Sequence, residues 1–343
     1  MSARHATLLA ALAAIWGGSY LLIKYGLEDL EPAVIVWVRC VLAAIVLFAV
    51  LRLRAGGSEA RAALAELLAR PGRALLMGFL AIGLPFTLIT FGELAVPSGL
   101  TAVLIAPASL FVAAFAPFID RSERVQRSGV LGMVMGLAGV ALLVGVESVQ
   151  SLGEFLGAMA MLGAAACYAL SSFVVKRYRG LSSTAVSFLS ITVGAVMTLP
   201  AAVATAPAEL PGVRAIAAVT ALGVVGTAVA FVIFYTLIAE TGAARASLVS
   251  YLAPGMALAY GALLLDEAIT PASVAGLVLI LGGVALASRQ PRPEPVAARA
   301  RDLRQKSLRS RSHGPDPLAP GDGVPRRGAE LAGGEPPRAD ARW

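Results

Sequence analysis

The sequence predicts an all-α integral membrane protein of about ten transmembrane helices, built as two inverted halves of five helices each. Three observations support this fold class. The 343-residue chain is 58% hydrophobic and only 14% charged, whereas soluble globular proteins carry about 25% charged residues. It contains long apolar runs along most of its length, and its two halves repeat one pattern of polar and proline residues.

The apolar runs are long enough to be spanning helices. Such a helix needs about 20 mainly apolar residues, because its backbone polar groups must be satisfied within the segment. Runs of this kind lie at 6–24, 33–51, 74–92, 97–119, 129–146, 154–175, 184–204, 215–238, 244–265 and 271–288. The first run resembles a signal sequence, but it continues into WGGSYLLIK and further runs follow, so we expect it to be retained.

The basic residues predict the orientation. If the N-terminus lies in the cytoplasm, 25 of the 28 Lys and Arg residues fall on the cytoplasmic side, 12 of them between Arg289 and Arg342. The positive-inside rule therefore places both termini in the cytoplasm. Residues 289–343 are rich in Pro, Arg, Ala and Gly, and we expect them to form a disordered basic tail.

The composition gives little support to other classes of function. The net charge of +7 is explained by topology rather than by a nucleic-acid-binding face. Cys40 and Cys167 lie in apolar runs without a CxxC pair, and His5 and His313 lie outside every run. We therefore expect no metal, no cofactor and no nucleic-acid partner, and the absence of catalytic motifs predicts that the chain is not an enzyme.

An internal repeat relates the two halves. Three blocks recur in the same order: Trp16, Ser19 and Lys24 as Tyr168, Ser171 and Lys176; Glu93, Ala106 and Pro107 as Glu240, Ala253 and Pro254; and Glu123, Gly132 and Gly139 as Glu267, Gly276 and Gly283. Because each half holds an odd number of helices, the second half enters the membrane from the opposite side. Inverted repeats are typical of transporters that work by alternating access.

These motifs resemble the EamA family of the drug/metabolite transporter superfamily. The resemblance covers about residues 6–288 and is carried by 16–24, 32–39 and 250–284, with a diverged copy at 105–140. It implies EamA repeats at 1–146 and 154–288, a location in the bacterial inner membrane, and export of amino acids or related metabolites. The first copy departs from the pattern after residue 117, which leaves Glu123 or Asp120 as the counterpart of Glu267.

Pro107 and Pro254 indicate where the transport pathway lies. Each proline frees the backbone carbonyl four residues earlier, and paired interruptions in the two halves are a pointer to a transporter site. Arg39 lies about 10 Å from the end of its helix. A cation at that depth needs a partner, water or a route to the interface. One hypothesis is that Arg39 pairs with an anionic group of the substrate or with a structural carboxylate. The alternative is that its side chain extends to the membrane interface beside Trp37. The family resemblance favours a role of Arg39 in the site.

The remaining candidates are aromatic, hydroxyl and charged side chains. Together with Arg39 and the two prolines, the predicted pathway residues are Trp16, Ser19, Tyr20, Thr90, Tyr168, Ser172, Tyr235, Ser250 and Tyr251. The predicted helix-end charges are Lys24, Glu93, Lys176, Glu240, Glu123 and Glu267. No Asp or Glu lies deep inside a predicted helix, which leaves facilitated diffusion, exchange or protonation at a helix end.

The sequence leaves several alternatives open. The expected partners are a small-molecule substrate and the lipid bilayer, with a homodimer as one alternative for the assembly. An organic-anion or phosphorylated-metabolite exchanger of the same superfamily is the second transport hypothesis, and a receptor or scaffold without transport is the alternative from another class. The substrate, the direction of transport and any coupling ion are not defined by these residues.

Overall fold

The computed structural model describes residues 2–55, 57–119, 127–146, 151–175, 177–178, 180–241, 243–246 and 248–287. Within these ranges the ordered elements are α-helices and two π-helical segments, with no strand. This confirms the all-α prediction. The tail at 289–343, Glu123 and Lys176 lie outside the described residues.

The helices follow the apolar runs closely. Their bounds are α1 Ala3–Gly26, α2 Pro32–Ala55, α3 Ser58–Ala69, α4 Pro71–Gly78, η1 Phe79–Gly83, α5 Leu84–Gly92, α6 Ser98–Ile105, α7 Ala108–Ile119, α8 Arg127–Val146, α9 Leu152–Val175, α10 Ser183–Ala204, α11 Val213–Gly223, η2 Val224–Val229, α12 Ala230–Thr241, α13 Ala243–Ala246, α14 Val249–Leu264 and α15 Pro271–Ala287. The short helix α3 falls between predicted spans and has no counterpart among them.

Seven helical stretches in the described part of the chain are long and apolar enough to cross a membrane. Three apolar helices are shorter: Ser128–Leu143, Val249–Leu264 and Pro271–Leu286. The chain is therefore a multi-pass membrane protein by helix length and composition, while the count of ten spans stays a prediction.

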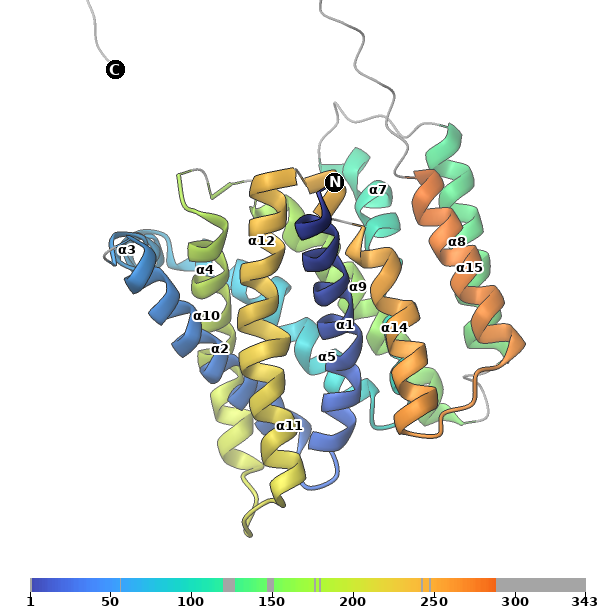
Figure 1. The fold of residues 1–343 in the computed structure, drawn as a ribbon, viewed down its shortest axis with the longest axis horizontal. Helices are drawn as coiled ribbons and strands as arrows, with labels where there is room; N and C mark the ends of the chain where they lie inside the picture. Colours follow the sequence, from blue (N-terminus) through green and yellow to red (C-terminus); the bar gives the residue numbers. More distant parts are fainter. Residues whose placement is uncertain are drawn as a thin grey trace, which may run out of the picture. The chain divides into compact units, whose positions relative to one another are not determined.

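Helices from the two halves of the sequence pack against one another. Helix α1 packs on α14, α2 on α10, α5 on α9, and α8 on α15; the last pair lies side by side at one edge of the bundle (Figure 1). Glycines allow this pair to approach closely. A Cβ atom on Gly283 would lie 2.5 Å from the carbonyl oxygen of Gly132, and one on Gly139 would lie 2.9 Å from that of Gly276.

One local arrangement occurs in both halves. Gly78 ends α4, and a Cβ atom there would lie 2.5 Å from Val193 Cβ of α10. Gly223 ends α11, and a Cβ atom there would lie 2.8 Å from Leu42 Cβ of α2. A π-helical segment follows each glycine. A close helix contact followed by a π-helical segment is thus found before Glu93 and again before Glu240.

The two candidate prolines have different local structures. Pro107 lies in the turn between α6 and α7, where the helix is interrupted. Pro254 lies inside α14, which continues without a break. The expected interruption is therefore present at Pro107 only. Because Pro254 has no N–H, the carbonyl of Ser250 in the first turn of α14 lacks its usual helical donor.

Candidate functional site

A cavity of about 540 Å³ lies among helices from both halves of the chain. Its volume is within the range of small-molecule sites, about 300–1,000 Å³. The wall is mainly apolar and aromatic. Eight of the predicted pathway residues line it: Trp16, Ser19, Tyr20, Arg39, Tyr168, Ser172, Ser250 and Pro254.

The other predicted pathway residues lie outside the cavity wall. They are Thr90, Pro107, Tyr235 and Tyr251, none of which lines the cavity. Thr90 is fully buried and donates a hydrogen bond to the carbonyl of Phe86 at 2.9 Å. The hydroxyl oxygen of Tyr235 accepts a hydrogen bond from Ser187 at 2.7 Å. These contacts indicate packing roles for Thr90 and Tyr235 in this conformation.

Arg39 is the cation in the cavity wall, and its side chain is held without a carboxylate partner among the described residues. It is 5% exposed. Its Nη2 and Nε atoms lie 3.1 Å and 3.4 Å from the hydroxyl oxygen of Thr227, to which they donate. The guanidinium carbon lies 3.9 Å from the centre of the Phe86 ring, a cation–π contact. The positive charge is thus positioned by a neutral hydroxyl and a ring.

The π-helical segment η2 explains the position of Thr227. The Thr227 hydroxyl donates to the carbonyl of Leu222, five residues earlier, at 2.9 Å. A side-chain bond over five residues fits the wider π-helical turn, and π-helical segments are frequent at functional sites. Thr227 is fully buried, and its hydroxyl oxygen accepts from Arg39 while its proton is donated to Leu222.

Aromatic rings form the other part of the wall. The ring centre of Trp16 lies 5.2 Å from that of Phe234 and 6.3 Å from that of Phe231. Tyr20 and Tyr168 line the same cavity. The cavity therefore combines one guanidinium with large aromatic surfaces, an arrangement that suits a solute with an anionic group and an apolar body.

Charged residues lie next to one end of the cavity, and we call it the Glu93 end. Ile23 and Ile89 line the cavity there and are 1% and 4% exposed. Lys24 follows Ile23 in α1, and its Nζ donates a hydrogen bond to the main-chain carbonyl of Glu93. Glu93 itself is 0% exposed.

Glu267 joins the two halves at the Glu93 end. Its carboxylate accepts from the main-chain N–H of Ser98 at 2.7 Å, from that of Gly99 at 3.0 Å and from the Ser98 hydroxyl at 3.1 Å. It therefore caps the start of α6, where negative charge is favoured. A Cβ atom on Gly261 would lie 2.2 Å from Glu267 Oε2, so the carboxylate fills the space left by that glycine.

The corresponding carboxylate in the second half, Glu240, has a different environment at the opposite end of the bundle. Its side chain is 38% exposed and is paired with Arg4, and its Oε2 atom lies 2.9 Å from His5 Nε2. The two repeat-related glutamates therefore differ in the conformation described: Glu93 is enclosed and Glu240 is open to its surroundings.

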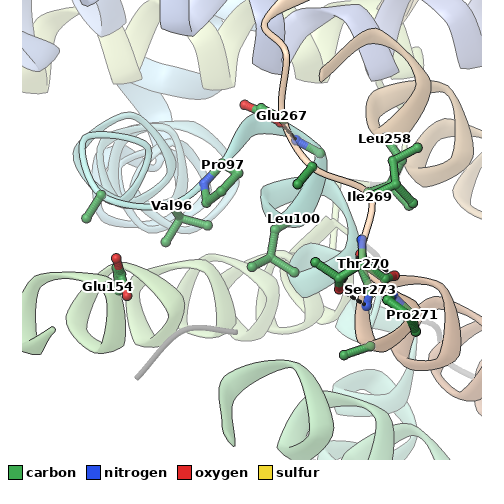
Figure 2. A pocket seen from close by; sticks show the side chains of 14 residues that line it. Val96, Pro97, Leu100, Glu154, Leu258, Glu267, Ile269, Thr270, Pro271 and Ser273 are labelled. Atoms are coloured by element: carbon green, nitrogen blue, oxygen red, sulfur yellow. Dashed lines mark hydrogen bonds between the residues drawn. The ribbon is translucent and has the colours of Figure 1, made fainter. Parts of the chain in front are cut away.

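A second cavity of about 630 Å³ lies beyond the Glu93 end. Figure 2 shows four residues of its wall: the carboxylates Glu154 of α9 and Glu267, and the apolar residues Val96 and Leu100. It shares no lining residue with the central cavity in the described part of the chain. Thr270 and Ser273 form reciprocal side-chain-to-backbone hydrogen bonds at its rim, where α15 begins (Figure 2).

The fold and the cavity define the class: a helical, multi-pass membrane protein with a cavity among helices from both halves of the chain. The model of the EamA-like transporter family matches residues 4–145 and 155–289. The chain belongs to this family, which confirms the resemblance seen in the sequence.

Individual relatives agree with the family assignment. The chain is 28% identical to an uncharacterized inner membrane transporter of Escherichia coli K12, YedA, over 81% of this chain and 88% of the relative. It is 27% identical to a probable amino-acid metabolite efflux pump of the same strain, over 83% and 94%. One solved crystal structure matches with a TM-score of 0.60 at 18% identity, over 84% of this chain and 97% of the other, which supports the fold alone.

Proposed function

We propose that this protein is a secondary transporter that exports amino acids or related small metabolites across the bacterial cytoplasmic membrane by alternating access. The observation that carries the proposal is Arg39, a buried guanidinium without a carboxylate partner among the described residues, in a cavity walled by aromatic rings. A carboxylate on the solute supplies the missing partner, and the rings pack against its apolar part.

Two inverted repeats explain how one cavity serves both sides of the membrane. Helix α1 ends near Glu93, because Lys24 in its last turn donates a hydrogen bond to the main-chain carbonyl of Glu93. Helix α9 begins at the same end, since a Cβ atom on Gly157 would lie 2.7 Å from the Val96 side chain. The first helices of the two halves therefore run in opposite directions. The repeated glycine and π-helical arrangement supports the same duplication.

The proposal includes ten spans and cytoplasmic termini. Helix α8 has 20 residues, about 30 Å at 1.5 Å per residue, which matches the hydrocarbon core. Helices α14 and α15, with 16 and 17 residues, cover about 24–26 Å and cross with their flanking residues. With the N-terminus inside, the Glu93 end faces the outside and the Glu240 end faces the cytoplasm.

A phosphorylated-metabolite exchanger is the second transport hypothesis. A phosphate dianion in a desolvated site needs more than one cationic partner. Arg39 is the one Lys or Arg among the described residues that line the cavity, and Lys24 donates to a main-chain carbonyl instead. The charge of the cavity therefore favours a monocarboxylate solute over a phosphate.

Transport in vesicles separates these functions. Inside-out vesicles that contain the protein are incubated with amino acids, their amphipathic analogues or sugar phosphates, and uptake is compared with uptake by vesicles without the protein. Uptake of carboxylate solutes supports the proposal, and uptake restricted to phosphates supports the exchanger. No movement of any solute, with folded protein at normal abundance, would favour a receptor or scaffold and count against transport of these classes.

A further inference from the structure

The Glu93 side chain is buried at the Glu93 end of the cavity, without a hydrogen-bond partner among the described residues. It is 0% exposed, and neither of its carboxyl oxygens has a hydrogen-bond partner among the described residues. A buried carboxylate that lacks donors costs several kcal/mol. A neutral carboxyl group in the same place avoids most of that cost.

The charged groups around Glu93 do not remove this cost. Lys24 of α1, Arg39 of α2 and Glu267 of the segment after α14 act on it electrostatically, together with the phenol of Tyr20. Lys24 donates to the main-chain carbonyl of Glu93 rather than to its carboxyl group. Arg39 donates to the Thr227 hydroxyl.

Glu267 is the second carboxylate at this end. Its two oxygens accept three hydrogen bonds at the start of α6, whereas the oxygens of Glu93 accept none from the described residues. A second carboxylate nearby is disfavoured by like-charge repulsion. The proton at this end therefore belongs on Glu93.

The repeat supplies an internal comparison. Glu240 occupies the corresponding position at the opposite end, where it is exposed and paired with Arg4 and His5. The same residue type thus has partners where its side chain is exposed, and none among the described residues where its side chain is buried.

We propose that Glu93 is a proton-binding site, loaded in the conformation described, and that closure of the Glu93 end takes up one proton from the solution on that side. The inference rests on the proposed function in one respect, that the cavity opens alternately at its two ends. When the Glu93 end opens, water and Lys24 stabilise the carboxylate and the proton leaves to the same solution.

The sign of the pH effect follows from linkage. The closed state binds the proton more tightly than the open state, so low pH favours closure and rising pH favours opening. One proton changes the ratio of open to closed protein by up to tenfold per pH unit. The ratio of open to closed protein begins to change at the pKa of an exposed glutamate, about 4.3, and continues to change at higher pH.

A cysteine at Ile89 reports the opening directly. Cys40 and Cys167 are replaced by Ala, and Ile89→Cys is labelled with a membrane-impermeant maleimide added to the solution that the Glu93 end faces. Right-side-out and inside-out vesicles identify that side. We expect the labelling rate to rise with pH by up to tenfold per pH unit more than it rises in the same reporter that also carries Glu93→Gln. The thiol titrates in both proteins, so the comparison removes its contribution.

Two further variants control the assay. Glu31→Gln removes an exposed carboxylate and should leave the pH response unchanged. Glu93→Asp keeps a titrating group, so we expect the pH response to remain, with its midpoint at lower pH. An unchanged midpoint would contradict the proposal. This variant therefore replaces Glu93→Gln if Glu93→Gln does not fold. Equal responses in Glu93→Gln and the wild type would overturn it, as would a response that disappears in Glu31→Gln.

The assay needs no transported solute, so it is independent of the proposed cargo. A Glu93-dependent response in a protein that moves no amino acid would support the proton site and count against the export of amino acids. Transport of amino acids with a response that is independent of Glu93 would overturn the proton site alone.

Discussion

Replacing Arg39 by Met separates a role in binding from a role in stability. Arg39→Met keeps an extended side chain against Phe86 and removes the charge and the hydrogen bonds to Thr227. If the guanidinium binds a solute carboxylate, its loss removes a charge-assisted hydrogen bond worth about 1.5–3 kcal/mol. At about 1.4 kcal/mol per factor of ten, transport efficiency falls roughly 10- to 150-fold.

The same change should not weaken the fold. In the solute-free protein the hydrogen bonds from Arg39 to Thr227 contribute about 1.5–3 kcal/mol and the cation–π contact about 1–2 kcal/mol. Desolvation of a cation without a carboxylate partner costs several kcal/mol and offsets these contributions. We therefore expect Arg39→Met to keep or raise the Tm of the purified protein in detergent.

The assay combines uptake in vesicles with thermal unfolding. Arg214→Gln is the matched control, since Arg214 is exposed and paired with Glu28 at 3.2 Å; it should leave uptake unchanged. A Tm that falls by several degrees in Arg39→Met, with uptake lost only in proportion to folded protein, would contradict the binding role and assign Arg39 a structural role.

Two further predictions concern the residues that hold the site. Thr227→Val leaves the Arg39 guanidinium without its hydroxyl acceptor, and we expect a several-fold rise in KM for carboxylate solutes; an unchanged KM would show that Thr227 does not position Arg39. Gly261→Ala places a methyl group in the space of Glu267, which should displace the cap of α6 and lower the Tm by several degrees; a wild-type Tm would contradict the capping role.

Much of the fold was predictable because lipid imposes a strong constraint on sequence. Each long apolar run had to be a helix, and the predicted runs overlap the helices closely. The helix α3 was not predicted, because its Ala, Glu, Leu and Arg residues form no apolar run. Gly132 and Gly283 belong to the repeated blocks, and small residues such as these allow close helix contact.

The candidate site was only partly predictable. Trp16, Arg39 and Tyr168 were identified because aromatic and charged residues stand out in apolar helices. Phe86 and Phe234 also line the cavity, but a phenylalanine that faces a cavity has the same sequence pattern as one that faces lipid. A hydrophobic period cannot distinguish these two environments.

Thr227 and Glu93 depend on tertiary structure. The partner of Thr227 is set by a π-helical turn, which the apolar pattern of 215–238 does not indicate. Glu93 was expected at a helix end, and helix ends are usually hydrated. In the structure Glu93 is buried, its main-chain carbonyl accepts from Lys24 of α1, and Glu267 caps α6 at the same end; these contacts come from distant parts of the sequence.

Export of carboxylate solutes is tested by counterflow in liposomes that contain the purified protein. They are preloaded with an unlabelled aromatic amino acid and diluted into the labelled solute. We expect transient accumulation of label above that in protein-free liposomes, suppressed by carboxylate-bearing competitors and not by the matching decarboxylated amines. Equal competition by acids and amines would contradict the role given to Arg39, and no accumulation with correctly folded protein would contradict transport of this class of solute.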